Sequence, residues 1–435
     1  MRKLLQFVFL MMATQSAWAA CSGSSPNWTS TPDSSSVQTC VNNASNGDTI
    51  TISGGSATYS STVTISKGLT IKVASGQTVT LTSSSASGPP FFTITGTGSN
   101  FVHISGDNGS GDCSASTSNC GLVLLRQNDS GFNSSAILVV GPASAFRFDH
   151  ILGNKGDAFL YSNPDSSATG PALGVIDHSY LENYGRTYFA RDQRSTDGTY
   201  GTACPSGNNG GTAWHEFIGN ESTYAGSNKE IYFENDTFTW NSAPATFGQG
   251  AFYSQYGGKV VVRYSTFTHW SEQVTDEGDN PACGSVYYEI YNNTFTEDCN
   301  ITGFGCEGKI LDMRSGQSLV HDNTFTSSST PLNFINYPNG HPNLGHDIKN
   351  SFFWNNTWNG SACQSDSNPS GAACVVVDSS SQSPVPTRNT NYWLRAPNQV
   401  SDVYFGYTPY TYPHPLLGKT VTQVSPPSGL TATVQ

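Results

Sequence analysis

Short runs in which apolar and polar residues alternate follow one another along most of the chain. The first four occupy residues 49–52, 62–65, 69–73 and 78–81. Alternation with a period of two is typical of a β-strand with one buried face, and Gly, Ser and Asn break the runs as turn residues do. No 3.6-residue apolar period continues over a dozen residues, so we expect few helices. The pattern predicts an all-β protein made of short strands.

A six-residue pattern that closes on an aromatic residue recurs at a nearly constant interval. The closing residues, which are 29, 28, 30 and 28 residues apart, are Phe238, Phe267, Phe295, Phe325 and Phe353. Weaker copies lie at residues 146–151 and 175–180. A fixed repeat of this length indicates one unit stacked on copies of itself, a solenoid. Because leucine-rich and hexapeptide signatures are absent, we predict a parallel β-helix with coils of about 28–30 residues.

Stacked coils also account for the high Asn content. Two neighbouring positions of the repeat carry Asn or Asp, namely Asn235, Asn292 and Asn350 at the first and Asp236, Asn293 and Asn323 at the second. Asn tolerates turn dihedral angles, and its amide can bond the same amide one coil away. We therefore expect an Asn ladder and an interior stack of the closing Phe residues, at about 4.8 Å per coil. Both are predicted to be structural.

The first 19 residues have the features of an export signal. Arg2 and Lys3 precede an apolar run at residues 4–12, and residues 17–19 (Ala-Trp-Ala) form a small-x-small cleavage site. The apolar run is too short to span a bilayer as a helix. Cys21 leaves a lipid anchor as an alternative, although Trp18 fits that pattern poorly. We predict a signal peptide, a location in the periplasm or outside the cell, and no membrane span.

The repeat divides the rest of the chain into three parts. Residues 48–360 are predicted to form the β-helix. Residues 20–47 and 361–435 are expected to cap its two ends, because the end of a solenoid otherwise exposes strand edges.

The net charge limits the kinds of molecule that the protein is expected to bind. Without the first 19 residues the net charge is 17 − 31 = −14, which argues against a nucleic-acid partner. Acidic sugars remain compatible, provided that local cations or a metal bind them.

The ten cysteines, an even number without a C-x-x-C motif, predict disulfides and not structural zinc. Sequence proximity suggests Cys21–Cys40, Cys113–Cys120, Cys299–Cys306 and Cys363–Cys374, which leaves Cys204–Cys283, although spacing alone leaves other connectivities open.

One outward column of side chains is a candidate binding surface. The residue after the apolar residue that opens each repeat should point outward, and this rule selects Glu234, Arg263, Tyr291, His321 and Lys349. All of them are ionisable or form hydrogen bonds, and neighbouring coils are about 4.8 Å apart. The column is either a solvated, mutually neutralising face or a groove that binds a ligand along the solenoid.

A second candidate site follows the strand around Phe267. Asp276, Glu277 and Asp279 could bind calcium through oxygen ligands or divide acid and base roles, and they could also form an ordinary acidic loop. Trp270 precedes this acidic loop, and the loops of adjacent coils are expected to bring Arg186, Arg191 and Arg194 on one side and Lys309, Asp312 and Arg314 on the other. Acidic and basic groups that converge on one side of a solenoid indicate a site.

The Asn-Asn-Thr-Phe coils, the export signal and the stretch from Tyr407 to Pro415 resemble bacterial secreted right-handed parallel β-helix proteins of the pectate-lyase-like superfamily. The resemblance covers most of the chain after residue 19. It implies lyases and glycoside hydrolases acting on acidic polysaccharide, beside members without demonstrated catalysis. In the lyases a base removes the proton α to a uronate carboxylate, while calcium or Arg neutralises the developing charge. On this resemblance the catalytic candidates are Arg263, His321 and Arg314.

These observations lead to one functional hypothesis and two alternatives. We predict a monomeric polysaccharide lyase that acts on uronate-containing polysaccharide by β-elimination, with Ca²⁺ as a candidate cofactor bound by Asp276, Glu277 and Asp279. The substrate-binding candidates are Glu234, Tyr291, Lys349, Trp270, Arg186 and Arg194. A non-catalytic extracellular polysaccharide-binding or surface protein is the first alternative. A glycoside hydrolase is the second, and it is disfavoured because Glu234 and Glu289 should lie roughly 10 Å apart, beyond the usual carboxylate separations.

Overall fold

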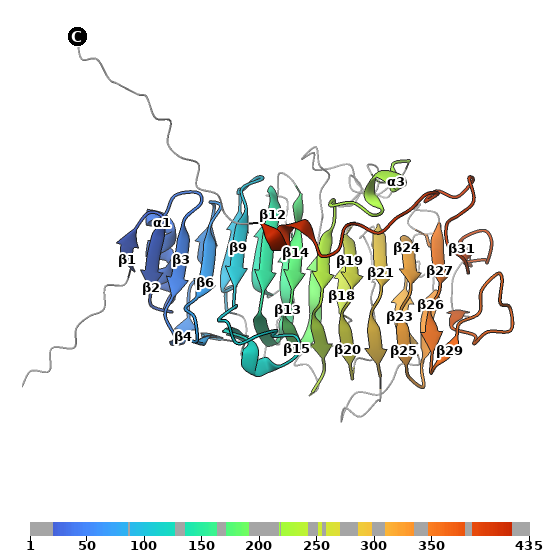
Figure 1. Cartoon of the computed structure of the whole chain (residues 1–435), viewed down its shortest axis with the longest axis horizontal. Coiled ribbons are helices and arrows are strands. Elements are labelled where there is room, and N and C mark those ends of the chain that lie inside the picture. The colour runs from blue at the N-terminus through green and yellow to red at the C-terminus, as the bar shows by residue number, and fades with distance from the viewer. Residues whose placement is uncertain are drawn as a thin grey trace, which may run out of the picture.

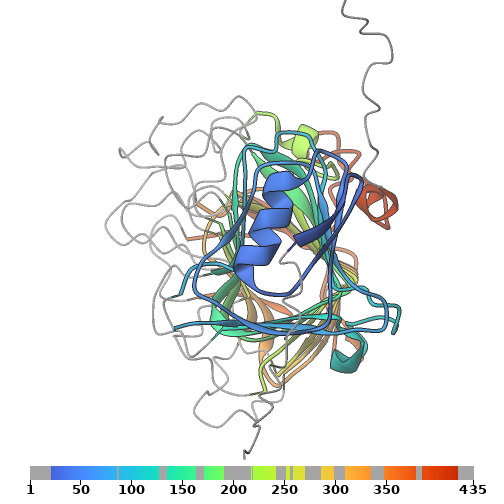
Figure 2. The same ribbon diagram turned by 90° about the vertical axis from the view of Figure 1, so that its left-hand side faces the viewer.

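The chain forms a parallel β-helix, the fold class that the repeat predicts (Figure 1). The computed structural model describes residues 21–85, 88–126, 135–162, 171–190, 217, 219–241, 251–254, 258–269, 286–297, 309–334, 347–378 and 385–419. Figure 2 looks along the stack of coils and shows the chain winding around an elongated cross-section, with α1 (Ser34–Asn43) across the near end. The coils bear strands on three faces, which we call face 1, face 2 and face 3.

Face 1 is a single 13-stranded sheet. Its strands in spatial order are β1 (Cys21–Ser24), β2 (Asn27–Ser30), β3 (Thr49–Ile52), β6 (Thr70–Val73), β9 (Val102–Ser105), β12 (Ala143–Asp149), β14 (Ala172–Asp177), β16 (Ile231–Glu234), β19 (Lys259–Arg263), β21 (Tyr287–Tyr291), β24 (Gln317–His321), β27 (Ser351–Trp354) and β31 (Tyr392–Trp393). The β1–β2 pair is antiparallel and the other pairs are parallel.

Face 2 follows face 1 in each coil. Its strands are β4 (Gly55–Tyr59), β7 (Val79–Ser83), β10 (Leu122–Leu125), the first part of β13 (Ile151–Ser162), the first part of β15 (Tyr180–Ala190), β17 (Thr237–Thr239), β20 (Thr266–Thr268), β22 (Thr294–Thr296), β25 (Thr324–Thr326), β28 (Thr357–Trp358) and β29 (Ser361–Ala362). Only β29 pairs in the antiparallel direction among these described strands.

Face 3 completes the coils. It contains β5 (Val63–Ile65), β8 (Phe92–Thr95), β11 (Ser135–Val140), the second parts of β13 and β15, β18 (Phe252–Ser254), β23 (Lys309–Met313), β26 (Thr330–Phe334) and β30 (Val375–Val377). The remaining described helices are short: η1 (Thr117–Asn119), α3 (Glu221–Tyr224) and η2 (Pro415–Gly418). No helix in the described ranges is long and apolar enough to cross a membrane.

The predicted Phe stack fills the interior on face 2. Phe238, Phe267, Phe295 and Phe325 pair in register, and successive ring centroids are 4.6, 4.4 and 4.9 Å apart. The rings are almost parallel and buried. Each coil therefore presents the same surface to the next one, which is why the sequence repeats.

The predicted Asn ladder occupies the two-residue turn between faces 1 and 2. Asn293 Nδ2 donates to Asn323 Oδ1 at 3.0 Å, and Asn323 Nδ2 donates to Asn356 Oδ1 at 3.0 Å. The first turn residue has a positive φ, as at Asn235 (56°) and Asn292 (56°). Asn adopts this conformation more readily than most residues. The ladder therefore satisfies buried polar groups at a turn that Asn favours.

The fifth copy of the repeat was predicted wrongly. Phe353 pairs with Val320, and the residue opposite Phe325 is Trp358. Trp354 therefore occupies the position assigned to Lys349, and Asn356, not Asn350, joins the ladder. The cause is a longer connection between β26 and β27, which shifts the motif to residues 353–358.

Three of the suggested disulfides are confirmed, namely Cys21–Cys40, Cys113–Cys120 and Cys363–Cys374. Cys204, Cys283, Cys299 and Cys306 lie outside the described residues. The first bridge links α1 to β1, and Val37 and Val41 of α1 are buried as well. It fastens the helix that covers the first coil.

The C-terminal segment, residues 404–419, follows a course that the sequence did not predict. Instead of capping the last coil, it runs back across face 1 toward β12 (Figure 1, red). Tyr404 bonds Gln317 of β24, Tyr407 bonds Glu289 of β21, and the carbonyl of Leu417 accepts a bond from Arg147 of β12. We call residues 404–419 the strap.

Candidate functional site

The predicted column is present on face 1. In-register pairing brings Glu234, Arg263, Tyr291 and His321 onto consecutive strands. The rings of Tyr291 and His321 stack at 4.8 Å, and the ring of Trp354 follows at 4.2 Å. Lys349 is not part of this column, because the shifted register puts Trp354 there.

The strap covers this column. Arg263 is fully buried, and its Nε donates to Glu234 Oε2 at 2.7 Å. Its Nη1 donates to Tyr291 Oη at 2.9 Å, and its Nη groups also donate to the carbonyls of Tyr410 and Thr411 at 2.7 and 2.9 Å. The bonds to the strap use the donors that a substrate carboxylate would need.

His321 of the column and the neighbouring Glu289, two residues before Tyr291 on β21, are covered as well. Burial raises the pKa of Glu289, although hydrogen bonds from Gly226, Tyr407 and Tyr287 counteract part of the effect. Burial lowers the pKa of His321, which lies 3.3 Å from Tyr407 Oη. While the strap is docked, a polysaccharide does not reach these groups. The catalytic roles of Arg263 and His321, and the binding roles of Glu234 and Tyr291, stay predictions that require the strap to move.

Several predicted site residues lie outside the described part of the chain. They are Trp270, Arg194, Asp276, Glu277 and Asp279. Arg186 lies in β15 opposite Ala158, and its side chain is also outside the described structure. Among the residues that are described, no three His, Cys, Asp or Glu side chains form a group that could hold a metal ion. The calcium site therefore stays a prediction.

Several long connections of the chain begin or end at strands of face 3, although residues 106–121 form a long connection between faces 1 and 2. Two residues join face 1 to face 2 in each central coil, as at 264–265 and 292–293. By contrast, residues 191–230, 240–251, 297–308 and 335–350 lead to or from strands of face 3. Long excursions from a regular scaffold are where binding and catalytic residues concentrate. This face is therefore the better candidate for a site.

A polar cluster lies on β23 and β26 of face 3. Asp312 is fully buried, and its Oδ2 receives Arg314 Nε at 2.8 Å and Lys309 Nζ at 2.9 Å. Asn333 Nδ2 donates to Asp312 Oδ1 at 2.7 Å. The side chains of Lys309 and Arg314 are 17% and 18% exposed, so both are mostly buried and reach the surface in part. One buried carboxylate thus holds two partly exposed basic side chains.

The sequence analysis identified Arg314 as a candidate but did not predict Asn333, which donates to Asp312. Asp312 and Asn333 are opposite each other in the β23–β26 pair, although they are 21 residues apart (333 − 312). This separation is shorter than the 28–30-residue period because the connections from β23 to β24 and from β25 to β26 are only a few residues long. A weak signal was present, since residues 311–313 (Leu-Asp-Met) and 332–334 (Leu-Asn-Phe) share one apolar-polar-apolar pattern.

Comparison with known proteins finds only distant similarity to solved structures. No protein-family model matches the sequence, and no curated protein is similar to it at a significant level. Among solved structures, a mannuronic-acid-specific family 6 polysaccharide lyase from human gut microbiota is similar, with 13% identity and a TM-score of 0.41 over 76% of this chain and 74% of that one. An alginate lyase from Paenibacillus sp. str. FPU-7 is 14% identical, with a TM-score of 0.39 over 84% of this chain and 98% of that one. The PL6 family alginate lyase AlyGC is 10% identical, with a TM-score of 0.39 over 85% of this chain and 53% of that one. At this level of similarity the comparison carries no conclusion on activity or substrate.

Proposed function

We propose that this protein is a polysaccharide lyase that cleaves uronate-containing polysaccharide by β-elimination on face 3. The observation that supports the proposal is that two partly exposed basic side chains, Lys309 and Arg314, are held by the buried carboxylate of Asp312. Neutralising the carboxylate of a uronate is the central electrostatic requirement of this reaction. Lys309 and Arg314 lie on the same carboxylate, so both basic side chains are held close to one point of this surface.

The residues of the cluster have distinct chemical roles in the proposal. Arg314 has a planar guanidinium suited to a carboxylate, so it binds the uronate carboxylate and stabilises the negative charge as the C5 proton leaves. Lys309 is assigned to accept that proton from its neutral form, so in this step Arg314 is the cation that faces the uronate and Lys309 is the base; Lys can lose its own proton whereas Arg cannot. The bond from C4 to the leaving oxygen then breaks, a C4–C5 double bond forms, and water protonates the leaving oxygen. Asp312 and Asn333 are positioning residues.

The proposal also includes calcium binding and export from the cell. Asp276, Glu277 and Asp279 remain the predicted calcium ligands, and loss of activity on chelation would support them. Three disulfides among the described cysteines favour an oxidising compartment, in agreement with the predicted signal peptide. We therefore propose that the substrate is an extracellular polysaccharide.

The test is a turnover assay of the mature protein on a panel of uronate polymers. The unsaturated product absorbs in the ultraviolet, so activity should appear as a rise in absorbance. Arg314→Ala should abolish that rise, whereas Arg388→Ala, at a partly exposed ion pair with Asp366, should not. If no polymer in a broad panel gives the signal, the lyase proposal is wrong. Binding without turnover would instead identify a non-catalytic polysaccharide-binding protein.

A further inference from the structure

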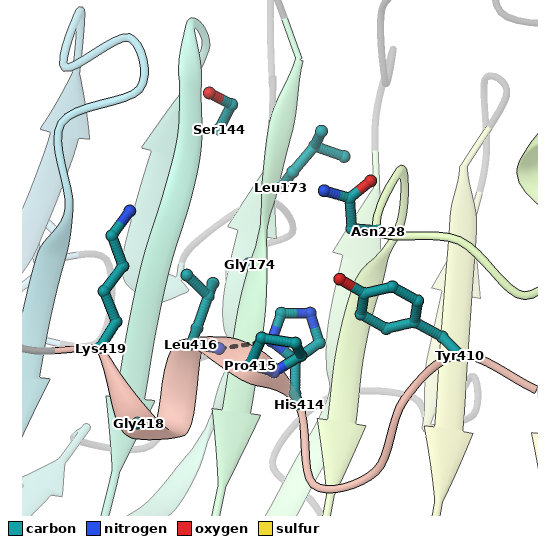
Figure 3. Close-up of a pocket in the computed structure, with 10 residues that line it drawn as sticks. All are labelled: Ser144, Leu173, Gly174, Asn228, Tyr410, His414, Pro415, Leu416, Gly418 and Lys419. Atoms are coloured by element: carbon teal, nitrogen blue, oxygen red, sulfur yellow. Dashed lines mark hydrogen bonds between the residues drawn. The ribbon is translucent and has the colours of Figure 1, made fainter.

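A cleft of about 450 Å³ lies between the strap and face 1, beside β12 and β14. Figure 3 shows Lys419 at one end, Asn228 and Tyr410 at the other, and Leu173 and Leu416 between them. The cleft is separate from the Asp312 cluster, which lies on face 3. Its volume falls in the range of small-molecule sites.

The polar groups of the cleft are mainly hydrogen-bond donors or groups that can donate. Leu416 N–H donates to His414 Nδ1 at 3.2 Å, so the proton of the neutral imidazole is on Nε2, where it can be donated. Burial and the positive charge of Arg263 lower the pKa of His414 to about 3, so this ring is neutral at pH 7. The Asn228 amide and the Tyr410 hydroxyl add two further polar groups.

The charge of the cleft favours an anion. Lys419 is the only charged residue among the described lining residues, and no carboxylate is among them. Asp177, on the adjacent strand β14, is already engaged by Arg147, whose Nε and Nη2 donate to its two oxygens at 2.8 and 2.7 Å. Arg147 Nη1 also donates to the carbonyl of Leu417 and so fixes the strap at this point.

We propose that this cleft binds one acidic sugar unit, a hexuronate, as a second polysaccharide subsite away from face 3. Leu173 and Leu416 offer an apolar wall to the C–H face of a sugar ring, while Lys419 meets the carboxylate. Asn228, Tyr410 and His414 are placed to bond the ring hydroxyls. The inference deepens the proposed function and rests on it only for the choice of ligand.

The experiment is isothermal titration of the mature protein with a uronate oligosaccharide and with a neutral oligosaccharide of equal length. Both are also titrated into Arg314→Ala, which cannot consume the ligand by the proposed reaction. Lys419→Ala should weaken binding of the acidic oligosaccharide about 5- to 10-fold and leave the neutral one unchanged. Leu173→Trp, which fills the cleft, should weaken it at least as much. Lys72→Ala is the matched control, since Lys72 is an exposed lysine on β6 of the same face.

The outcomes separate this inference from the proposed function. Binding that Arg314→Ala abolishes, but that Lys419→Ala and Leu173→Trp leave unchanged, assigns the ligand to face 3 and overturns the cleft. Equal affinity for the acidic and the neutral oligosaccharide overturns the choice of a uronate. Binding that depends on Lys419, in a protein without turnover on any uronate polymer, supports the cleft and contradicts the lyase proposal. Circular dichroism of each variant shows whether it has folded.

Discussion

Arg263 and Glu234, which lie on adjacent strands of face 1, form a fully buried ion pair whose other hydrogen bonds hold the strap. Glu234 Oε1 accepts the backbone N–H of His414 at 2.9 Å, and Arg263 donates to the carbonyls of Tyr410 and Thr411. The pair therefore links β16 and β19 to strap residues that lie about 150–180 positions later in the chain. It is therefore a structural link between the solenoid and its C-terminal segment.

Arg263→Ala should detach the strap. The substitution leaves the Glu234 carboxylate buried without its partner, and breaking a buried ion pair on one side costs about 3–5 kcal/mol. We expect a lower melting temperature and faster proteolysis or hydrogen exchange within residues 404–419. Arg388→Ala removes an ion pair whose side chains are 36% and 31% exposed, and it should change stability by only about 0–1 kcal/mol. Equal effects of the two variants would contradict the assigned role of Arg263.

Glu230→Gln should stabilise the protein at high pH. Neither carboxyl oxygen of the buried Glu230 has a hydrogen-bond partner among the described residues, and burial, assisted by the charge of Glu289, raises its pKa well above the usual value. Below about pH 4.3 the group is protonated in both states. As pH rises further, the unfolded chain loses the proton first, so stability falls.

The Glu230→Gln variant does not lose stability in this way, because the Gln side chain does not ionise. Denaturant unfolding should show a gain of about 1–3 kcal/mol over the parent protein at pH 8, and almost none at pH 4. A gain of the same size at both pH values would show that ionisation of Glu230 is not the cause.

Asn323→Ala should destabilise the β-helix strongly although it removes only a small side chain. Its Oδ1 accepts from the backbone N–H of Asn293 at 3.0 Å, and its Nδ2 donates to the carbonyl of Ile290 at 2.8 Å. Each buried polar group left without a partner costs about 1–3 kcal/mol, so we expect a loss of at least about 2 kcal/mol in denaturant unfolding. The neighbouring Thr324 is exposed, and Thr324→Ala should stay within about 0.5 kcal/mol of the parent protein.

Arg314→Lys should impair the proposed reaction without unfolding the protein. Lysine keeps the positive charge but loses the planar pair of donors that matches a carboxylate. We expect kcat/KM on the preferred uronate polymer to fall about 100-fold, in line with the loss of one charge-stabilising donor. Steady-state kinetics measure this change, and an unaltered melting temperature confirms the fold. Undiminished activity would exclude Arg314 from contact with the substrate.

Much of the fold was readable from the sequence because its determinants are local or periodic. The aromatic residue that closes each repeat and the Asn residues before it lie at constant offsets, so Phe267 could be matched with Phe295, and Asn293 with Asn323, before their contacts were known. The match failed at Phe353, where a spacing of 28 residues coincided with the expected period. The better signal there was the motif itself, because residues 355–358 read Asn-Asn-Thr-Trp.

The sites were less accessible to this reasoning. Strand alternation correctly grouped Glu234 with Arg263, but it cannot report whether another part of the chain covers an outward face. Asp312 and Asn333 of face 3 were not paired in the sequence analysis because irregular connections change the repeat length there. Grouping residues across coils requires a constant register, and only faces 1 and 2 of the central coils have one.

By itself, the sequence determined that the chain stacks β-coils and that Phe and Asn ladders hold them together. It also suggested the disulfides at residues 21–40, 113–120 and 363–374, which the structure confirmed. These features depend on residues at short or repeated separations. Only the tertiary structure decided that the Tyr- and Pro-rich strap turns back and buries the ionisable column. The reason is physical: docking of the strap depends on the combined shape, burial and hydrogen bonding of strands from many coils. No periodicity in the sequence records that combination.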